Sequence, residues 1–175
     1  MENGYYTGKL GLKLSEKYKD TKYSVYYSHP NERDESNACR PQTFMNKCSN
    51  ATSLSWLDIV FLNQERNQVE LIIEIEEEGS EPKKVIGDIG SVILSDQIRI
   101  TEAKEKDYDF GNLTFIMGVK VNPDGSRVEK IKLICERMLE LNEELPEREM
   151  EIIPIVNGDI NELMMKIESK IAEII

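Results

Sequence analysis

The chain lacks the features that mark secreted and membrane-spanning proteins. No window approaches eighteen consecutive apolar residues, the length that a transmembrane helix needs. The opening sequence MENGYYTGK contains no apolar signal-peptide core. Only three cysteines occur, and this odd number argues against a disulfide framework and favours reduced thiols. We therefore expect a cytoplasmic protein with no membrane partner.

Basic residues are also in deficit, which at first argues against a nucleic-acid partner. The chain carries 22 Lys and Arg against 33 Asp and Glu, a net charge of −11, whereas phosphate binding depends on clustered cations. The excess of acidic residues lies in the second part of the chain. Residues 1–50 hold 8 basic and 6 acidic side chains, whereas residues 51–175 hold 14 basic and 27 acidic side chains. The first part could still face a polyanion. Lys9, Lys13 and Lys17 form one helical stripe there, which is equally typical of a solvated face.

The chain contains no internal repeat and no low-complexity linker, and its 175 residues suit one domain spanning 1–175. The patterns predict a helix over 8–19, a strand over 21–28 and a hairpin of strands 56–62 and 69–76. A helix opening at Pro82, a strand over 113–121, a helix from Ser126, a strand over 151–156 and a helix from Asp159 follow. This order predicts an α/β fold, a mixed central β-sheet flanked by helices. The polar stretch 29–53 is either functional, mobile or partly helical.

The last three predicted helices each carry an apolar stripe for the core. Ser126 with Glu129 has the spacing of a capping box, and Asp159 with Glu162 repeats it, while Asn122-Pro123-Asp124-Gly125 is a turn sequence. Cys135 is expected to be a buried structural thiol. The stripes are Val85, Ile86, Ile89, Ile93 and Ile98; Val128, Ile131, Ile134, Cys135 and Met138; and Ile160, Leu163, Met164, Ile167 and Ile171.

Acidic residues interrupt two neighbouring apolar runs. Asp58 lies in WLDIVFL, and Glu74 and Glu76 lie sixteen and eighteen residues later in VELIIEIEEE. Alternation along the second strand places Ile72, Glu74 and Glu76 on one face and Val69, Leu71, Ile73 and Ile75 on the other. Asp58, near the start of the antiparallel neighbour, is expected to lie beside Glu74 and Glu76, so that three carboxylates converge. A buried carboxylate costs several kcal/mol unless a cation or donor meets it, so the acids predict a site for a hard divalent ion. A solvated strand end is the alternative, which we accept for Glu77, Glu78 and Glu81.

Through these acids and the order of its predicted elements, the chain resembles the PD-(D/E)XK nuclease superfamily, whose members have the restriction endonuclease-like fold. The core of that family is a helix, three strands, a helix and a strand (αβββαβ), and the resemblance covers about residues 8–121. Asp58 corresponds to the first acid of the motif. Glu74-Ile75-Glu76 corresponds to the second part of the motif, in which an acid, any residue and a lysine follow one another. Leu57 replaces the proline that often precedes the first acid, and Glu76 replaces the lysine. Residues 126–175 would be a C-terminal α-β-α extension.

The resemblance implies a divalent-metal-dependent phosphodiester hydrolase that acts on DNA. Asp58, Glu74 and the carbonyl of Ile75 would bind Mg²⁺ or Mn²⁺, and Glu76 would hold a second ion or accept a proton. Lys83 or Lys84 would supply the missing positive charge. Some members of the family have a further acid on the first helix, which would be Glu16 here. An exposed charge pair along that helix explains Glu16 equally well. Two copies would be needed to cut both strands of a duplex, which implies a homodimer.

Other residues suggest weaker sites. His29, Cys39 and Cys48 could ligate zinc, although their spacing matches no zinc signature, and Cys39 could be a nucleophile with His29 as base. Trp56 is expected in the core, with stacking on a base as the alternative. The charged residues of the 29–53 stretch that could follow a phosphate backbone are Arg33, Arg40 and Lys47.

Two further classes of function compete with hydrolysis. A non-catalytic binding or scaffold module with the nuclease fold is favoured by Glu76 in the lysine position and by the net charge of −11. A receiver-like domain with Asp58 as phosphoacceptor is disfavoured. Its acceptor should end a central strand after an earlier acid pair, and Asp58 instead begins a strand with no such pair before it.

Overall fold

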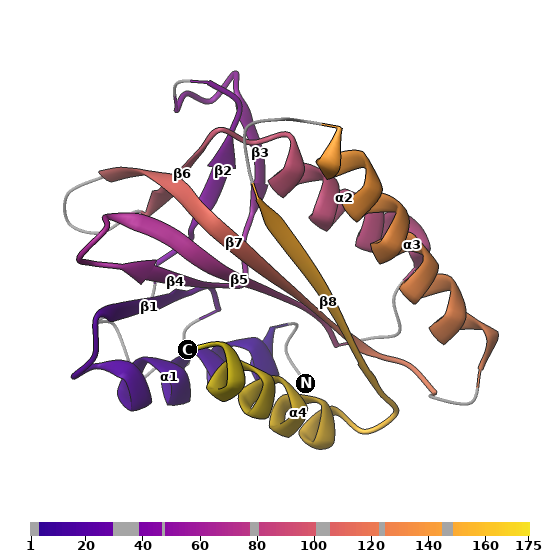
Figure 1. The fold of residues 1–175 in the computed structure, drawn as a ribbon. Coiled ribbons are helices and arrows are strands. Elements are labelled where there is room, and N and C mark those ends of the chain that lie inside the picture. The colour runs from indigo at the N-terminus through magenta and orange to yellow at the C-terminus, as the bar shows by residue number, and fades with distance from the viewer. Residues whose placement is uncertain are drawn as a thin grey trace.

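The computed structural model describes residues 4–29, 39–46, 48–77, 81–100, 106–122, 125–144 and 149–175. These residues form four helices and one eight-stranded sheet (Figure 1). The helices are α1 (Tyr5–Tyr18), α2 (Pro82–Ile93), α3 (Ser126–Glu143) and α4 (Ile160–Ile174). The strands are β1 (Tyr23–Tyr27), β2 (Gln42–Phe44), β3 (Ser53–Trp56), β4 (Ile59–Asn63), β5 (Gln68–Glu76), β6 (Gln97–Ile100), β7 (Lys106–Lys120) and β8 (Met150–Asn157).

The sheet is mixed, and β5 and β7 lie at its centre. β1, β4 and β5 pair antiparallel in that order, and β5 then pairs in parallel with β7. On its other edge β7 pairs first with β6, antiparallel, and then with β8, in parallel. β2 adds to β6, and β3 adds to β2, both antiparallel. The parallel pairs need crossover connections, and α2 and α3 provide them.

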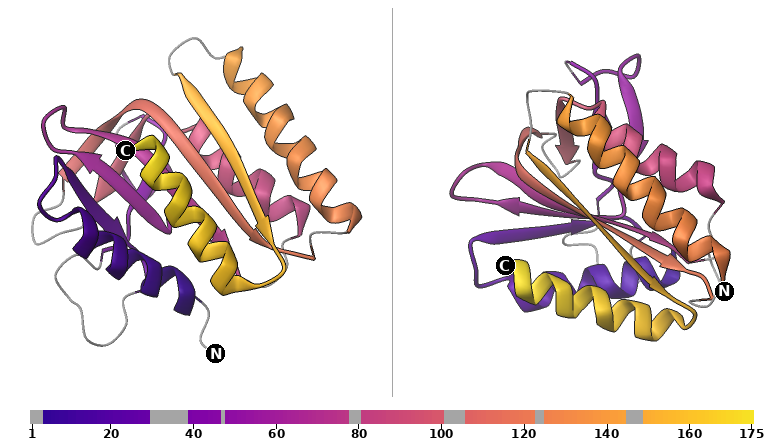
Figure 2. Two further views of the ribbon diagram at one scale, coloured as in Figure 1. Left: turned by 60° about the horizontal axis from the view of Figure 1, so that its bottom comes forward. Right: turned by 45° about the vertical axis from the view of Figure 1, so that its right-hand side comes forward.

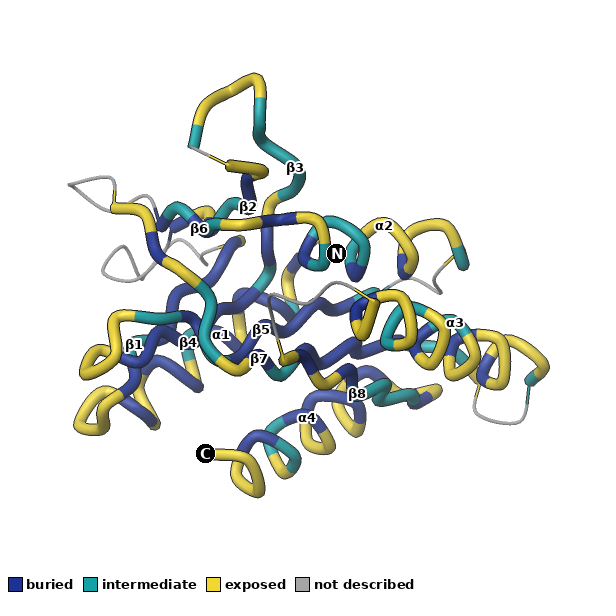
Figure 3. Tube along the Cα trace, turned by 45° about the horizontal axis from the view of Figure 1, so that its top comes forward, coloured by how far each residue is buried: buried dark blue, intermediate teal, exposed yellow. Residues whose placement is uncertain are grey.

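Helices cover both faces of the sheet. α1 and α4 lie side by side on one face, and α2 and α3 lie together on the other (Figure 2). Strand β4 shows the alternation, since Ile59 and Phe61 pack toward α1 and α4 while Val60 packs toward α2 and α3. The central strands are therefore buried along most of their length, as Figure 3 shows. This explains why they read as continuous apolar runs in the sequence.

Most of the predicted elements form within a few residues of their expected bounds. The hairpin of β4 and β5 is confirmed, as are the first strand and all four helices. Asp159 caps α4 as predicted, because its Oδ1 accepts hydrogen bonds from the N–H groups of Asn161 (2.8 Å) and Glu162 (3.0 Å). The predicted stripe of α4 is buried in full, and Cys135 is a buried free thiol.

Several predictions about the helices are wrong. Ser126 and Glu129 form no capping box, because α3 takes Gly125 as its N-cap and Ser126 is already the first helical residue. Ile98 belongs to β6, since α2 ends at Ile93. Ile86 is 46% exposed, and Val92 takes its expected place in the core. Of the predicted turn 122–125, Pro123 and Asp124 lie outside the described residues.

The strands also depart from the predictions at three places. Trp56 ends β3 with 53% of its surface exposed, so it does not belong to the core. The described part of 29–53 contains strand β2 and the first residue of β3, and no helix. Val69 packs with Ile72 toward α2 and α3, on the face opposite Leu71. The pairing with β4 shows the cause: Phe61 and Leu62 are adjacent in β4 but pair with Leu71 and Val69, so β5 has one extra residue there, which reverses the alternation.

Candidate functional site

The two interrupting acids meet where β4 begins and β5 ends. Asp58 directly precedes β4, and the pairing of Ile59 with Ile73 places it opposite Glu74. The N–H of Asp58 donates a hydrogen bond to Oε1 of Glu74 (3.2 Å), and Oδ2 of Asp58 accepts one from the N–H of Ile75 (2.8 Å). The structure thus brings together the two residues that the sequence singled out first.

Strand β1 fixes Asp58 from the other side. Ser28 follows the end of β1, and its N–H donates to the carbonyl of Asp58 (2.8 Å). The hydroxyl of Ser28 also lies 3.4 Å from Oδ1 of Asp58, at the long limit for a hydrogen bond. Both Asp58 oxygens therefore face donors, and the carboxylate is held between the ends of β1 and β5.

Helix α2 adds a lysine and a further carboxylate to this site. Nζ of Lys84 lies 3.0 Å from Oε2 of Glu76, and Asp88 follows Lys84 by one helical turn. Lys83 instead pairs with Glu81 (2.8 Å), and both of those side chains are largely exposed. The structure therefore selects Lys84 over Lys83 as the lysine near the acids. Asp88 was not predicted as a site residue, and its four-residue spacing from Lys84 was the available signal.

The electrostatics of the site favour protons or a cation on the acids. Burial raises the pKa of Asp58 to about 7 and the pKa of Glu74 well above its ordinary value. The charges of Asp58 and Asp88 raise the pKa of Glu74 further. Burial and the charge of Glu76 raise the pKa of Asp88 to about 6, against a lowering by Lys84. Lys84 lies beside Glu76, and within the described residues no basic side chain forms an ion pair with Asp58 or Glu74.

The donor set fits a hard divalent ion only in part. Among the residues that the structure describes, no three His, Cys, Asp or Glu side chains form a group that could hold a metal. Asp58, Glu74 and Glu76, which were expected to converge on one ion, thus form no such group. Mg²⁺, however, is commonly bound through one or two carboxylates, with water and substrate phosphates completing its coordination. Asp58 and Glu74 are joined through the main-chain N–H of Asp58, and no basic side chain of the described residues forms an ion pair with either. The residues fit an ion bound with few protein ligands and not an all-protein cage.

The remaining acids near the motif have other roles. Oε1 of Glu77 accepts hydrogen bonds from the N–H (2.9 Å) and the hydroxyl (3.1 Å) of Thr7. Glu77 thus caps the first turn of α1, and its interpretation as a solvated strand end is wrong. Glu81 is exposed, and Glu78 lies outside the described residues. Glu16 is exposed near the C-terminal end of α1, whereas Thr7 at the N-terminal end of α1 contacts Glu77, the residue that follows β5.

The structure does not bring the cysteines and the histidine together as a zinc site. Cys39 is buried, and its N–H donates to the carbonyl of Tyr27 in β1. Cys48 lies beside Gln97 of β6, and burial together with a hydrogen bond to Asp107 raises its pKa to about 11. His29 is exposed, with a left-handed backbone (φ 58°). The burial of Cys39 also opposes its proposed role as an accessible nucleophile.

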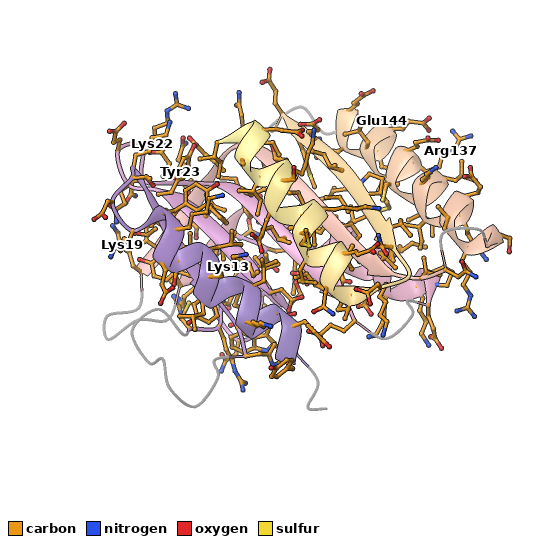
Figure 4. All side chains as sticks on the ribbon, turned by 90° about the horizontal axis from the view of Figure 1, so that it is seen from below. Lys13, Lys19, Lys22, Tyr23, Arg137 and Glu144 are labelled. Carbon is orange, nitrogen blue, oxygen red and sulfur yellow. The ribbon has the colours of Figure 1, made fainter. Side chains whose placement is uncertain are left out.

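Two lysines of the α1 stripe contact other side chains of the protein. Lys13 pairs with Glu168 of α4 (2.7 Å), and Lys17 lies 5.1 Å from the ring centroid of Tyr18. Figure 4 shows Lys13 on α1 at the side of α4. Lys13 therefore joins the two helices of one layer, and Lys17 contacts its own helix. Of the three cations proposed for a phosphate backbone, Arg33 and Lys47 lie outside the described residues and Arg40 is exposed.

Comparison with protein-family models, curated proteins and solved structures finds no match for this chain. Within the described residues, none of the helices has both the length and the apolar character needed to cross a bilayer.

Proposed function

We propose that this chain is a divalent-metal-dependent phosphodiester hydrolase of the PD-(D/E)XK type, with DNA as its substrate. One observation carries the proposal: Asp58 and Glu74 lie opposite each other on neighbouring strands with raised pKa values, and no basic side chain of the described residues forms an ion pair with either. A folded protein that keeps two such acids together loses stability unless a cation or proton binds them. A bound metal ion would offset this loss of stability and would supply the chemistry of hydrolysis.

The order of elements supports the proposal. α1, β1, β4, β5, α2 and β7 follow one another as a helix, three strands, a helix and a strand, with β2, β3 and β6 as additions. Asp58 lies at the start of the second of these three strands, and Glu74 and Glu76 lie near the end of the third. The resemblance places the motif acids at the same points of the core.

Each residue of the site has a distinct proposed role. Asp58, Glu74 and the carbonyl of Ile75 would hold Mg²⁺ or Mn²⁺, which would polarise the phosphodiester and lower the pKa of a bound water. Glu76 stands where the family has lysine, and it would accept a proton or help to hold a second ion. Lys84, 3.0 Å from Glu76, would stabilise negative charge on the reacting phosphate.

A non-catalytic module is the second candidate, and the hydrogen bonds of Asp58 favour it. Its Oδ2 accepts from the N–H of Ile75, so the carboxylate also has a structural use at the end of β5. Glu76 is likewise paired with Lys84. A protein that had lost hydrolysis could keep both contacts.

Calorimetric titration of Mn²⁺, extended to millimolar ion, separates these candidates without knowledge of the substrate. We expect the wild type to bind, and Asp58→Asn and Glu74→Gln each to abolish binding. Glu70→Gln is the matched control, because Glu70 lies on the same strand but bonds to Tyr23 and Asn63 outside the site. Cleavage of plasmid and oligonucleotide DNA should then fall more than about 100-fold in Asp58→Asn. Cleavage that survives Asp58→Ala would exclude this site, and absent binding in the wild type would favour the non-catalytic module.

A further inference from the structure

The single tryptophan of the chain lies on the surface, close to the acid pair. Trp56 is 53% exposed, although an indole ring normally gains free energy from burial. It ends β3 opposite Gln42 of β2. Leu57, which follows it, is buried, and the N–H of Leu57 donates to the carbonyl of Pro41 (2.8 Å). The chain on both sides of Trp56 is therefore fixed while its ring faces solvent.

An arginine lies over this ring. The guanidinium carbon of Arg40 is 5.9 Å from the ring centroid of Trp56, within the range of a cation–π contact. Arg40 is exposed and precedes Pro41, the residue that pairs with Leu57. The surface thus presents a flat aromatic ring and a delocalised cation together, the two groups that stack on bases and attract phosphates.

The position of Trp56 relative to the acids suits a nucleic-acid strand. Two residues of extended chain span at most about 7 Å, so the Cα atoms of Trp56 and Asp58 lie within that distance. In a stacked strand this corresponds to about two nucleotides. Ser55 also donates a hydrogen bond to Ser91 of α2 (2.6 Å), which ties β3 to the helix that carries Lys84 and Asp88.

We propose that Trp56 and Arg40 form a stacking site for an unpaired base of the strand whose phosphodiester lies at Asp58 and Glu74. This inference rests on the proposed function and narrows the substrate to single-stranded or locally unpaired nucleic acid. A base within a duplex is already stacked on its neighbours and cannot cover the indole face. Stacking on tryptophan tolerates every base, so we expect little sequence preference at this position.

Because Trp56 is the only tryptophan, its fluorescence reports directly on this site. The probe is a short unlabelled oligothymidylate, titrated in Ca²⁺, with a blunt duplex for comparison. We expect the single strand to quench the emission of Trp56 and the duplex to leave it unchanged. Anisotropy of the same strand carrying a fluorescein label gives the affinity of variants that lack tryptophan.

In the anisotropy measurement, Trp56→Ala should weaken binding roughly tenfold or more, and Trp56→Phe should retain most of the affinity. Arg40→Ala should weaken binding and reduce its salt dependence. Leu133→Ala is the control, because Leu133 is equally exposed (52%) on α3.

Two results would overturn the inference in distinguishable ways. In the first, the single-stranded oligonucleotide binds without quenching and with equal affinity to the wild type and Trp56→Ala. That result would contradict the stacking site and leave the proposed hydrolase function intact. Failure of the wild type to bind either the single strand or the duplex would contradict the stacking site and the proposed function together.

Discussion

Asp58 and Glu74 are joined by a hydrogen bond from the main chain of one to the side chain of the other, and not by an ion pair. The N–H of Asp58 donates to Oε1 of Glu74 over 3.2 Å, so a main-chain donor, and not a cationic side chain, stabilises the glutamate. The Asp58 carboxylate is stabilised in the same way by the N–H of Ile75. Main-chain donors of the hairpin therefore stabilise both carboxyl groups.

The first prediction is that stability falls as the pH rises from acidic to neutral values. Asp58 has a pKa of about 7 in the folded chain and an ordinary value near 3.8. Between these values the folded state binds more protons than the unfolded state, so the free energy of unfolding decreases with pH. The raised pKa of Glu74 acts in the same direction. We expect a loss of a few kcal/mol attributable to this pair between about pH 4 and pH 7.

Chemical denaturation of the wild type and Asp58→Asn across this range measures the effect. The two proteins should have similar stabilities near pH 4, and the variant should be the more stable one at pH 8. Millimolar Mn²⁺ should stabilise the wild type at pH 8 and have little effect at pH 4, where protons occupy the acids. Parallel stability profiles for the two proteins would contradict the assignment.

The convergence of Asp58 and Glu74 could be predicted from the sequence because it depends on local rules. A short turn makes β4 and β5 neighbours, and the period of two decides which side chains share a face. The register shift at Val69 lies before Glu74 in the chain, so it did not disturb the prediction for the acids. The caps and stripe of α4 followed from equally local patterns.

The surroundings of the acid pair depend on contacts between distant parts of the chain. Asp88 approaches the site only because α2 crosses the sheet between β5 and β7. Glu77 is bound by Thr7, seventy residues away. Trp56 is exposed because β2 and β3 extend the sheet through β6, a pairing that no pattern in 29–53 indicated. Sequence periodicity carries no information about such contacts.

The second prediction separates a catalytic from a purely structural role of Lys84. Its ammonium group lies beside Glu76, and that contact raises the pKa of Lys84. Lys84→Met should lower the rate of cleavage at least tenfold if the lysine stabilises charge on the phosphate. The same variant should bind Mn²⁺ somewhat more tightly, because a positive charge near the acids has been removed.

Lys83→Met is the matched control for this variant. Lys83 is the neighbouring lysine, 81% exposed and paired with Glu81, so both the rate and the Mn²⁺ affinity should stay within about twofold of the wild type. Calorimetry and single-turnover cleavage give the two quantities separately. Tighter metal binding in Lys84→Met with an unchanged rate would show that Lys84 only balances the charge of Glu76.

The third prediction concerns the close approach of α1 to β1. A Cβ atom added at Gly11 would lie 2.3 Å from Cγ and 2.5 Å from Cβ of Tyr27, a fully buried side chain. Because the Cβ of Tyr27 cannot move without its backbone, Gly11→Ala should cost about 3 kcal/mol or more in the free energy of unfolding. Gly87→Ala in α2 is the control, since nothing lies within 4 Å of the added atom. It should stabilise the chain by about 0.5–1 kcal/mol through helix propensity. Denaturant unfolding measures both changes, and equal stabilities of the two variants would refute this packing of α1 on β1.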